Sequence, residues 1–200
     1  MTTAYCFDLD GTLTRQELLP LIATSVGLYD EISVLTQATI NGVLPFDKSF
    51  KLRVRLLRDA NIKWIHDALS EQVEFDPSIL DFINRRPSQC FVVTGNLNVW
   101  VKPILDRLGI QSFTSIAKLQ DGRLEGVEYI LHKGDAVSGL RDRFDKIVAV
   151  GEGMNDVPMF EAADWRIAYG GTHAPNKLLV KLSDFVINDG SSLCRLLNML

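Results

Sequence analysis

The sequence predicts an α/β fold: a doubly wound, mostly parallel sheet with a small helical cap domain inserted near its start. Short apolar runs recur along the chain, namely AYCF, CFVVT, KIVAV, RIAY and DFVI. Longer segments with helical periodicity alternate with them, which is typical of βαβ units. The gap between the first two runs is too long for one crossover and holds helix-like stretches with few strand signals. We therefore expect a core of residues 1–14 and 76–200 and a helical cap of residues 15–75.

Local signals indicate the individual elements. In the cap, DKSFKLRVRLLRDA repeats apolar residues every three to four positions, which predicts an amphipathic helix. Asp76-Pro77 predicts a helix start, because proline suits the first helical turn. The segments LNVWVKPILDRLG and GDAVSGLRDRF predict two core helices. AKLQDGRLEGVEYI predicts a hairpin that turns at Asp121-Gly122.

Composition restricts the class of protein. The 200 residues are 46% apolar, enough for a substantial core, and carry a formal net charge of -4, which does not resemble a nucleic-acid-binding footprint. Cys6, Cys90 and Cys194 are few and widely spaced, so we expect free thiols and a cytoplasmic location. We expect neither a signal peptide nor a membrane partner, because no run approaches the ~20 apolar residues of a membrane helix. Whether the protein forms a homodimer stays open at this point.

Polar clusters follow the apolar runs or open helices, where ligands of an open parallel sheet bind. The clusters are Asp8/Asp10, Thr94-Gly95-Asn96, Lys133-Gly134 and Gly151-Glu152-Gly153-Met154-Asn155-Asp156.

The acid pair Asp8/Asp10 indicates phosphoryl chemistry. Residues i and i+2 of an extended chain point to the same side, where two carboxylates repel unless a cation or a shared proton intervenes. Hard oxygen ligands suit Mg²⁺, which is often held by few carboxylates and substrate phosphate. One acid could attack phosphorus while the other moves a proton. The alternative is a tight turn at Asp10-Gly11.

The other clusters also have structural interpretations. Thr94 and the following backbone N–H groups could hold an anion, or they could form an ordinary helix cap. Lys133 opens a predicted helix, where the macrodipole disfavours a cation unless an anion lies nearby. It could equally be a solvated surface lysine. Glu152 and Asp156 offer two further hard oxygens, or belong to a plain strand-to-helix turn.

In this order the four clusters resemble the haloacid dehalogenase (HAD) superfamily, and most closely its phosphoserine-phosphatase-like branch, which has a Rossmann-like core and a small helical cap. The motifs DLDGTLT and GEGMNDVPMF carry most of the resemblance, which spans nearly the whole chain. The resemblance implies that Asp8 is the nucleophile that becomes an aspartyl-phosphate. It implies that Asp10 protonates the leaving alcohol and then activates water. An alkoxide leaving group needs this second acid, so its presence favours ester hydrolysis.

The resemblance also implies roles for the remaining motif residues. Thr94 would hydrogen-bond the transferring phosphoryl group, and Lys133 would neutralise its charge. The implied Mg²⁺ ligands are Asp8, the backbone carbonyl of Asp10 and Glu152, with Asp156 supporting the metal shell. Glu152 departs from the family, which usually has aspartate at this position, and the longer side chain puts metal geometry in question.

Substrate recognition is implied for a few more residues. In phosphoserine phosphatases, which this chain resembles here, a residue matching Glu17 binds the substrate amino group and one matching Arg53 binds its carboxylate. Phe46 could pack over the ligand. Asn155 would face the phosphate or the metal waters, and Gly95 is a further candidate for substrate binding. Two alternatives stay open: Thr14-Arg15-Gln16-Glu17 is a capping-box pattern, and Arg53 lies in a basic run that is typical of a solvated face.

The sequence thus favours a Mg²⁺-dependent phosphomonoester hydrolase acting on phosphoserine or a similar small phosphate ester. The alternatives are a phosphotransferase to an acceptor alcohol and a non-catalytic phosphate-ligand binding protein. The histidines form no metal-ligand spacing, and the tryptophans are expected to be packing residues. These residues are His66, His132, His173, Trp64, Trp100 and Trp165.

Overall fold

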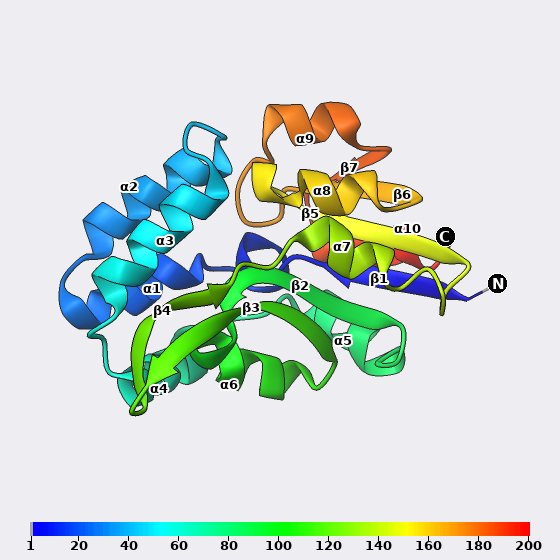
Figure 1. Ribbon diagram of the computed structural model, residues 1–200. Coiled ribbons are helices and arrows are strands. Elements are labelled where there is room, and N and C mark those ends of the chain that lie inside the picture. Colours follow the sequence, from blue (N-terminus) through cyan, green and yellow to red (C-terminus); the bar gives the residue numbers. More distant parts are fainter. Residues whose placement is uncertain (1) are drawn as a thin grey trace.

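The apolar runs become strands of one twisted sheet in the computed structural model, which describes residues 2–200 (Figure 1). The strands are β1 (Thr3–Phe7), β2 (Cys90–Leu97), β3 (Gln111–Gln120), β4 (Arg123–Tyr129), β5 (Lys146–Gly151), β6 (Trp165–Tyr169) and β7 (Phe185–Ile187). Their order is β4-β3-β2-β1-β5-β6-β7, and every neighbouring pair is parallel except β3 and β4. The predicted doubly wound, mostly parallel sheet is therefore confirmed.

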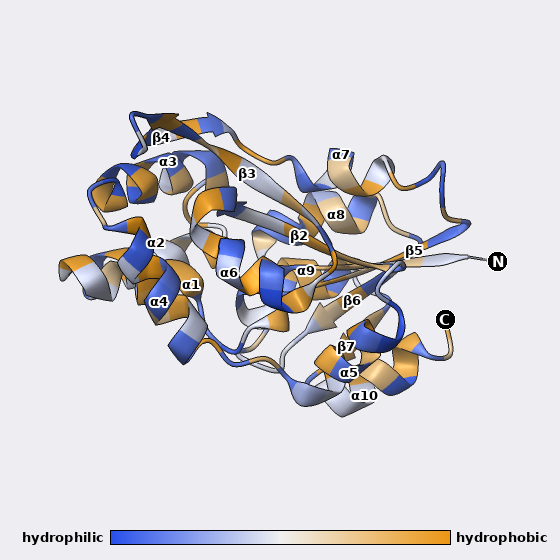
Figure 2. Ribbon diagram, turned by 90° about the horizontal axis from the view of Figure 1, so that it is seen from below, coloured by the Kyte–Doolittle hydropathy of each residue, from blue (hydrophilic) through white to orange (hydrophobic). Residues whose placement is uncertain are grey.

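Helices cover both faces of the sheet. One face packs α5 (Pro77–Arg85), α6 (Asn98–Leu108) and α10 (Gly190–Leu197), and the other packs α7 (Lys133–Ser138), α8 (Val157–Glu161) and α9 (Lys177–Leu182). Alternation along β1 explains the two layers, because Tyr5 and Phe7 enter one core cluster and Ala4 and Cys6 the other. Figure 2 shows the orange stripes and blue faces that such half-buried helices require.

The long gap after β1 is helical. It contains α1 (Leu18–Ala23), α2 (Tyr29–Ile40), α3 (Phe46–Leu57) and α4 (Ile62–Gln72). In Figure 1, α1, α2 and α3 stand together beyond one end of the sheet, whereas α4 packs against α6. The chain enters this group of helices near Thr14 and leaves it near Phe75. These two residues form an isolated antiparallel bridge.

Several local predictions are confirmed. Asp76 caps α5 by accepting hydrogen bonds from the backbone N–H groups of Ser78 and Ile79. The β3–β4 hairpin turns at Asp121 and Gly122, whose φ angles of 49° and 75° are those of a type I′ turn. Cys6, Cys90 and Cys194 are free thiols.

Two local predictions are wrong. The helix predicted over GDAVSGLRDRF ends at Ser138, because Gly139 is a poor helix former and the next residues continue as successive turns around the buried Leu140. Trp64 is 61% exposed on α4 and does not pack in the core, although Trp100 does. None of the helices in residues 2–200 combines the length and hydropathy that a bilayer crossing requires.

Candidate active site

The polar clusters meet at the carboxyl ends of the central strands. Asp8 follows β1, Thr94 lies in β2 and Glu152 follows β5, and β1 pairs with both β2 and β5. Strand order reverses here, so this edge is the topological switch point of the sheet. All three residues line one cavity, whose opposite wall comes from α2 and α3; the space inside it, including the part open to solvent, is about 470 Å³.

Lys133 joins two of the acids. Its Nζ lies 2.6 Å from Asp8 Oδ1 and 2.6 Å from Asp156 Oδ1, and the lysine is only 4% exposed. The second oxygen of Asp156 accepts the backbone N–H groups of Glu152 and Gly153 at 2.9 and 3.0 Å. The solvated-lysine interpretation is therefore wrong, and Asp156 shapes the loop that carries Glu152.

Asp10 is held by two donors. Its Oδ1 accepts the backbone N–H of Leu18 at 2.9 Å, and its Oδ2 accepts Asn96 Nδ2 at 2.6 Å. Thr94 Oγ1 accepts the backbone N–H of Asn96 at 3.1 Å, at the part of β2 where its pairing with β3 shifts register. The helix-cap interpretation of this cluster is wrong, because α6 begins only at Asn98. Sequence reasoning missed Asn96, although it stands inside the recognised cluster.

The cavity gathers more negative charge than its cations offset. Burial, and then the nearby Asp156, raises the pKa of Asp8 well above its usual range. Burial is also the main reason why the pKa of Asp10 rises to about 7 and that of Glu152 to about 8. Such shifts mark a site that a cation or a protonated ligand would stabilise.

We expect Glu152→Gln to gain stability over the wild type as pH rises through the window from about 4 to about 8, in metal-free buffer. The raised pKa means that the folded state binds more protons than the unfolded chain in this window. Stability rises with pH only where the unfolded chain binds more protons, so the Glu152 contribution falls as pH rises. Thermal unfolding in a chelator at several pH values measures the difference. Exposed Asp59→Asn is the control, and a pH-independent difference for Glu152→Gln would contradict the expectation.

The donor set fits a hard divalent cation. Asp8 and Glu152 are buried oxygen donors on one cavity, and Glu152 Oε2 has no hydrogen-bond donor. Gly11, at φ +67°, lets the Glu152 carboxylate lie against the first motif, since an added Cβ would come 2.7 Å from Oε2. Lys133 lies between Asp8, a predicted metal ligand, and Asp156, which is predicted to support the metal shell.

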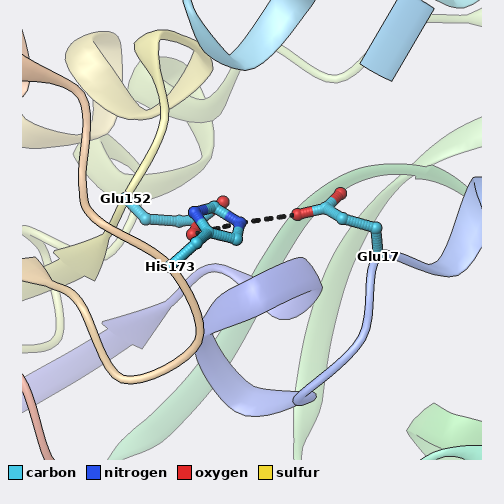
Figure 3. Close-up of side chains that lie close together, drawn as sticks. All are labelled: Glu17, Glu152 and His173. Carbon is cyan, nitrogen blue, oxygen red and sulfur yellow. Dashed lines mark hydrogen bonds and ion pairs between the residues drawn. The ribbon is translucent and has the colours of Figure 1, made fainter. Parts of the chain in front are cut away.

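His173 brings an unpredicted group to the site (Figure 3). Its Nε2 lies 2.8 Å from Glu152 Oε2 and 3.1 Å from Glu17 Oε1. The single N–H is directed at Glu17, so Glu152 Oε2 faces the ring without receiving an aligned hydrogen bond. Glu152 and then Glu17 raise the pKa of His173 to about 10, which makes the ring a cation between two acids. The ligand atoms of the three residues all lie within 4.8 Å of one another.

The capping-box interpretation of Glu17 is wrong. Glu17 precedes α1, but its side chain makes no capping hydrogen bond and reaches His173 instead. His173 could not be found from spacing, because it stands 156 residues from Glu17. Its one sequence signal is its place after the apolar run RIAY, where the other clusters also follow strands.

The wall that α2 and α3 form carries Arg53 and Phe46, both from α3. Arg53 is 4% exposed and donates to Thr36 Oγ1 at 3.0 Å, so the solvated-face interpretation is wrong for this residue. Burial lowers the pKa of Arg53 to about 10, and no carboxylate within residues 2–200 lies within 4 Å of it. Phe46 packs onto the backbone of Gly95, where an added Cβ would collide with the ring. Asn155 lines the same cavity.

Comparisons with known proteins agree with this geometry. The family model of haloacid dehalogenase-like hydrolases matches residues 6–161. A phosphoserine phosphatase of Methanocaldococcus jannaschii is 31% identical over 175 residues, which cover 82% of this chain and 83% of that protein. The phosphoserine phosphatase of Homo sapiens is 26% identical over 184 residues, covering 84% and 81% of the two chains.

Two solved structures match the whole chain. One is a phospho-aspartyl intermediate analogue of phosphoserine phosphatase, with a TM-score of 0.84 at 27% identity, covering 100% of this chain and 98% of that one. The other is a substrate-bound phosphoserine phosphatase complex, with a TM-score of 0.85 at 25% identity and the same coverage. The chain therefore belongs to the haloacid dehalogenase-like hydrolase family and is a phosphatase of its phosphoserine-phosphatase-like branch.

Proposed function

We propose that the protein is a Mg²⁺-dependent phosphomonoester hydrolase that works through an aspartyl-phosphate, with phosphoserine or a similar small phosphate ester as substrate. The observation that carries this proposal is the buried Lys133–Asp8 contact at the cavity that Asp10 and Thr94 also line. It supports the proposal, because the proposed nucleophile Asp8 contacts a buried cation and lines the same cavity as Asp10, the proposed proton carrier. The similar phosphoserine phosphatases support the substrate class.

In the first half-reaction, a carboxylate oxygen of Asp8 attacks phosphorus, and the bond from phosphorus to the ester oxygen breaks. Asp10 gives its proton to the departing alkoxide; its raised pKa, about 7, suits a group that must hold a proton near neutral pH. Thr94 and Lys133 stabilise charge on the transferring oxygens. Asn96 and the Leu18 backbone keep Asp10 in place.

In the second half-reaction, Asp10 takes a proton from water, which attacks the phosphorus of the aspartyl-phosphate. The bond from phosphorus to Asp8 breaks, and inorganic phosphate leaves. When bound, Mg²⁺ would supply charge neutralisation for the phosphate oxygens and the carboxylates. The residues that would hold it are Asp8, the backbone carbonyl of Asp10 and Glu152, with Asp156 behind them.

Residues 15–75 form the proposed cap, and residues 1–14 and 76–200 the proposed core. Arg53 is a buried guanidinium that lines the cavity without a carboxylate partner. A carboxylate on the substrate would supply that ion-pair partner. Glu17 offers charge for a substrate ammonium, although one of its oxygens already contacts His173. The rest of the cavity is lined by Phe46, Gly95 and Asn155.

A phosphate-release screen tests the proposed function. The protein is incubated with a panel of small phosphomonoesters, with Mg²⁺ or with a chelator. Mg²⁺-dependent release, fastest for phosphoserine among the alkyl esters, supports the proposal. Release that falls while a new ester forms on an added amino alcohol would indicate a phosphotransferase. Ligand binding with no release across the panel would indicate a binding protein.

We expect Arg53→Ala to raise the KM for phosphoserine by about 10- to 100-fold, since a charge-assisted hydrogen bond contributes ~1.5–3 kcal/mol. The KM for an aryl phosphate without a carboxylate should change little. Steady-state kinetics on both substrates measure the contrast. Exposed Lys51→Ala on the same helix is the matched control. Equal increases for both substrates would remove Arg53 from substrate recognition.

A further inference from the structure

We propose that His173 is a positioning residue that fixes the Glu152 carboxylate for Mg²⁺ binding. The inference rests on the proposed function, because it concerns the metal of the same site. His173 lies between β6 and α9, at the carboxyl end of the sheet where the motif residues gather. Neither the motifs nor the spacing of the sequence gave it a role.

The contact with Glu152 is close and buried. The ring nitrogen lies 2.8 Å from Glu152 Oε2, and Glu152 is only 2% exposed. Within residues 2–200, His173 is the one basic side chain with a nitrogen atom within 4 Å of this carboxylate. Burying a carboxylate without a polar or charged neighbour costs free energy. The carboxylate is therefore stabilised where it contacts the ring, and the ring restricts its position.

The loop that carries His173 is tied to Glu152 itself. The backbone N–H of Asn176 donates to the backbone carbonyl of Glu152 at 2.8 Å. Asn176 Nδ2 donates to the carbonyl of Ile40, at the end of α2, at 3.1 Å. The ring therefore approaches Glu152 from a loop that is fixed at both the core and the inserted helices.

Glutamate needs such a contact more than aspartate would. Its additional rotatable bond lets the carboxylate occupy more positions, whereas Mg²⁺ requires near-ideal octahedral geometry. On one side Gly11 leaves room for the carboxylate, and on the other the His173 ring limits it. Partners that orient metal ligands typically change metal affinity by 10- to 100-fold when they are removed.

The test measures Mg²⁺ affinity by isothermal titration calorimetry without substrate, so that the proposed role of Glu17 in substrate binding does not affect the result. The variants are His173→Ala, His173→Gln and the exposed neighbour Thr172→Ala as the matched control. We expect His173→Ala to weaken Mg²⁺ binding by about 10- to 100-fold. His173→Gln, whose polar side chain can still reach the Glu152 carboxylate, should recover much of the loss, and Thr172→Ala should match the wild type. High Mg²⁺ should restore phosphoserine turnover in His173→Ala.

Glu152→Asp provides a second arm. The shorter side chain ends one methylene further from the ring, so removing His173 in that background should cost much less affinity than in the wild type. Should His173→Ala prove unstable, His173→Asn replaces it with the same expected loss. Wild-type Mg²⁺ affinity in folded His173→Ala or His173→Asn would overturn the inference while leaving the proposed function intact. A wild-type protein that releases no phosphate would instead overturn the proposed function.

Discussion

Asp8→Asn is expected to abolish phosphate release from every phosphomonoester, with a loss of about 10⁴-fold or more, as for removal of other enzymatic nucleophiles. The amide cannot attack phosphorus, so no aspartyl-phosphate forms. Initial rates at saturating Mg²⁺ measure the loss. Mass spectrometry of acid-quenched reactions should show a phosphoryl adduct on the wild type and none on the variant.

The fold of Asp8→Asn should survive. Burial and Asp156 raise the pKa of Asp8, so its charged form is costly in the folded protein, and Lys133 keeps Asp156 as a partner. The metal-free unfolding temperature should therefore not fall. Asp59→Asn, at an exposed position, controls for the substitution itself. Turnover by Asp8→Asn near the wild-type rate would reject the nucleophile assignment.

The sheet could be predicted because its signals are local. The three central strands β1, β2 and β5 are short apolar runs buried on both faces, and the following polar residues mark their carboxyl ends. The cap-side residues were harder to interpret. Arg53 stands in a basic run that is typical of a solvated face, yet α3 turns this one cation into the cavity. The packing of α3 against α1, α2 and β4 accompanies that orientation, and these long-range contacts cannot be seen in the local sequence.

Long-range partners account for what the sequence did not predict. Asn96 belongs to a polar cluster that the sequence shows. Its hydrogen bond to Asp10, however, joins residues 86 positions apart in the chain. His173 has no motif around it, and its two carboxylate neighbours come from separate motifs. Trp64 was expected to pack in the core but is exposed. A large aromatic side chain can lie on the surface when its helix turns that face to solvent.

Lys133→Met should produce the largest loss of stability. Burial alone would lower the pKa of Lys133, but Asp156 and Asp8 outweigh it and raise that pKa. Methionine keeps most of the length and removes the charge, which leaves two buried carboxylates without their cation. Breaking such a buried pair costs about 3–5 kcal/mol. For a chain of this size each kcal/mol shifts Tm by roughly 2–4 °C, so the expected drop in Tm is on the order of 10 °C.

Lys102→Met is the matched control, because Lys102 Nζ lies 2.7 Å from Asp106 but both side chains are 62% exposed. An exposed pair of this kind contributes only about 0.3–0.5 kcal/mol, so Tm should hardly move. Asp8→Asn combined with Lys133→Met should be less destabilised than Lys133→Met alone, because one unpaired carboxylate is gone. Added Mg²⁺ should raise the Tm of Lys133→Met more than that of the double variant, since Asp8 would help to hold the ion. If Lys133→Met and Lys102→Met had the same Tm, the contact of Lys133 with its two carboxylates would contribute no more stability than a surface ion pair. The charge balance derived for the site would then be wrong.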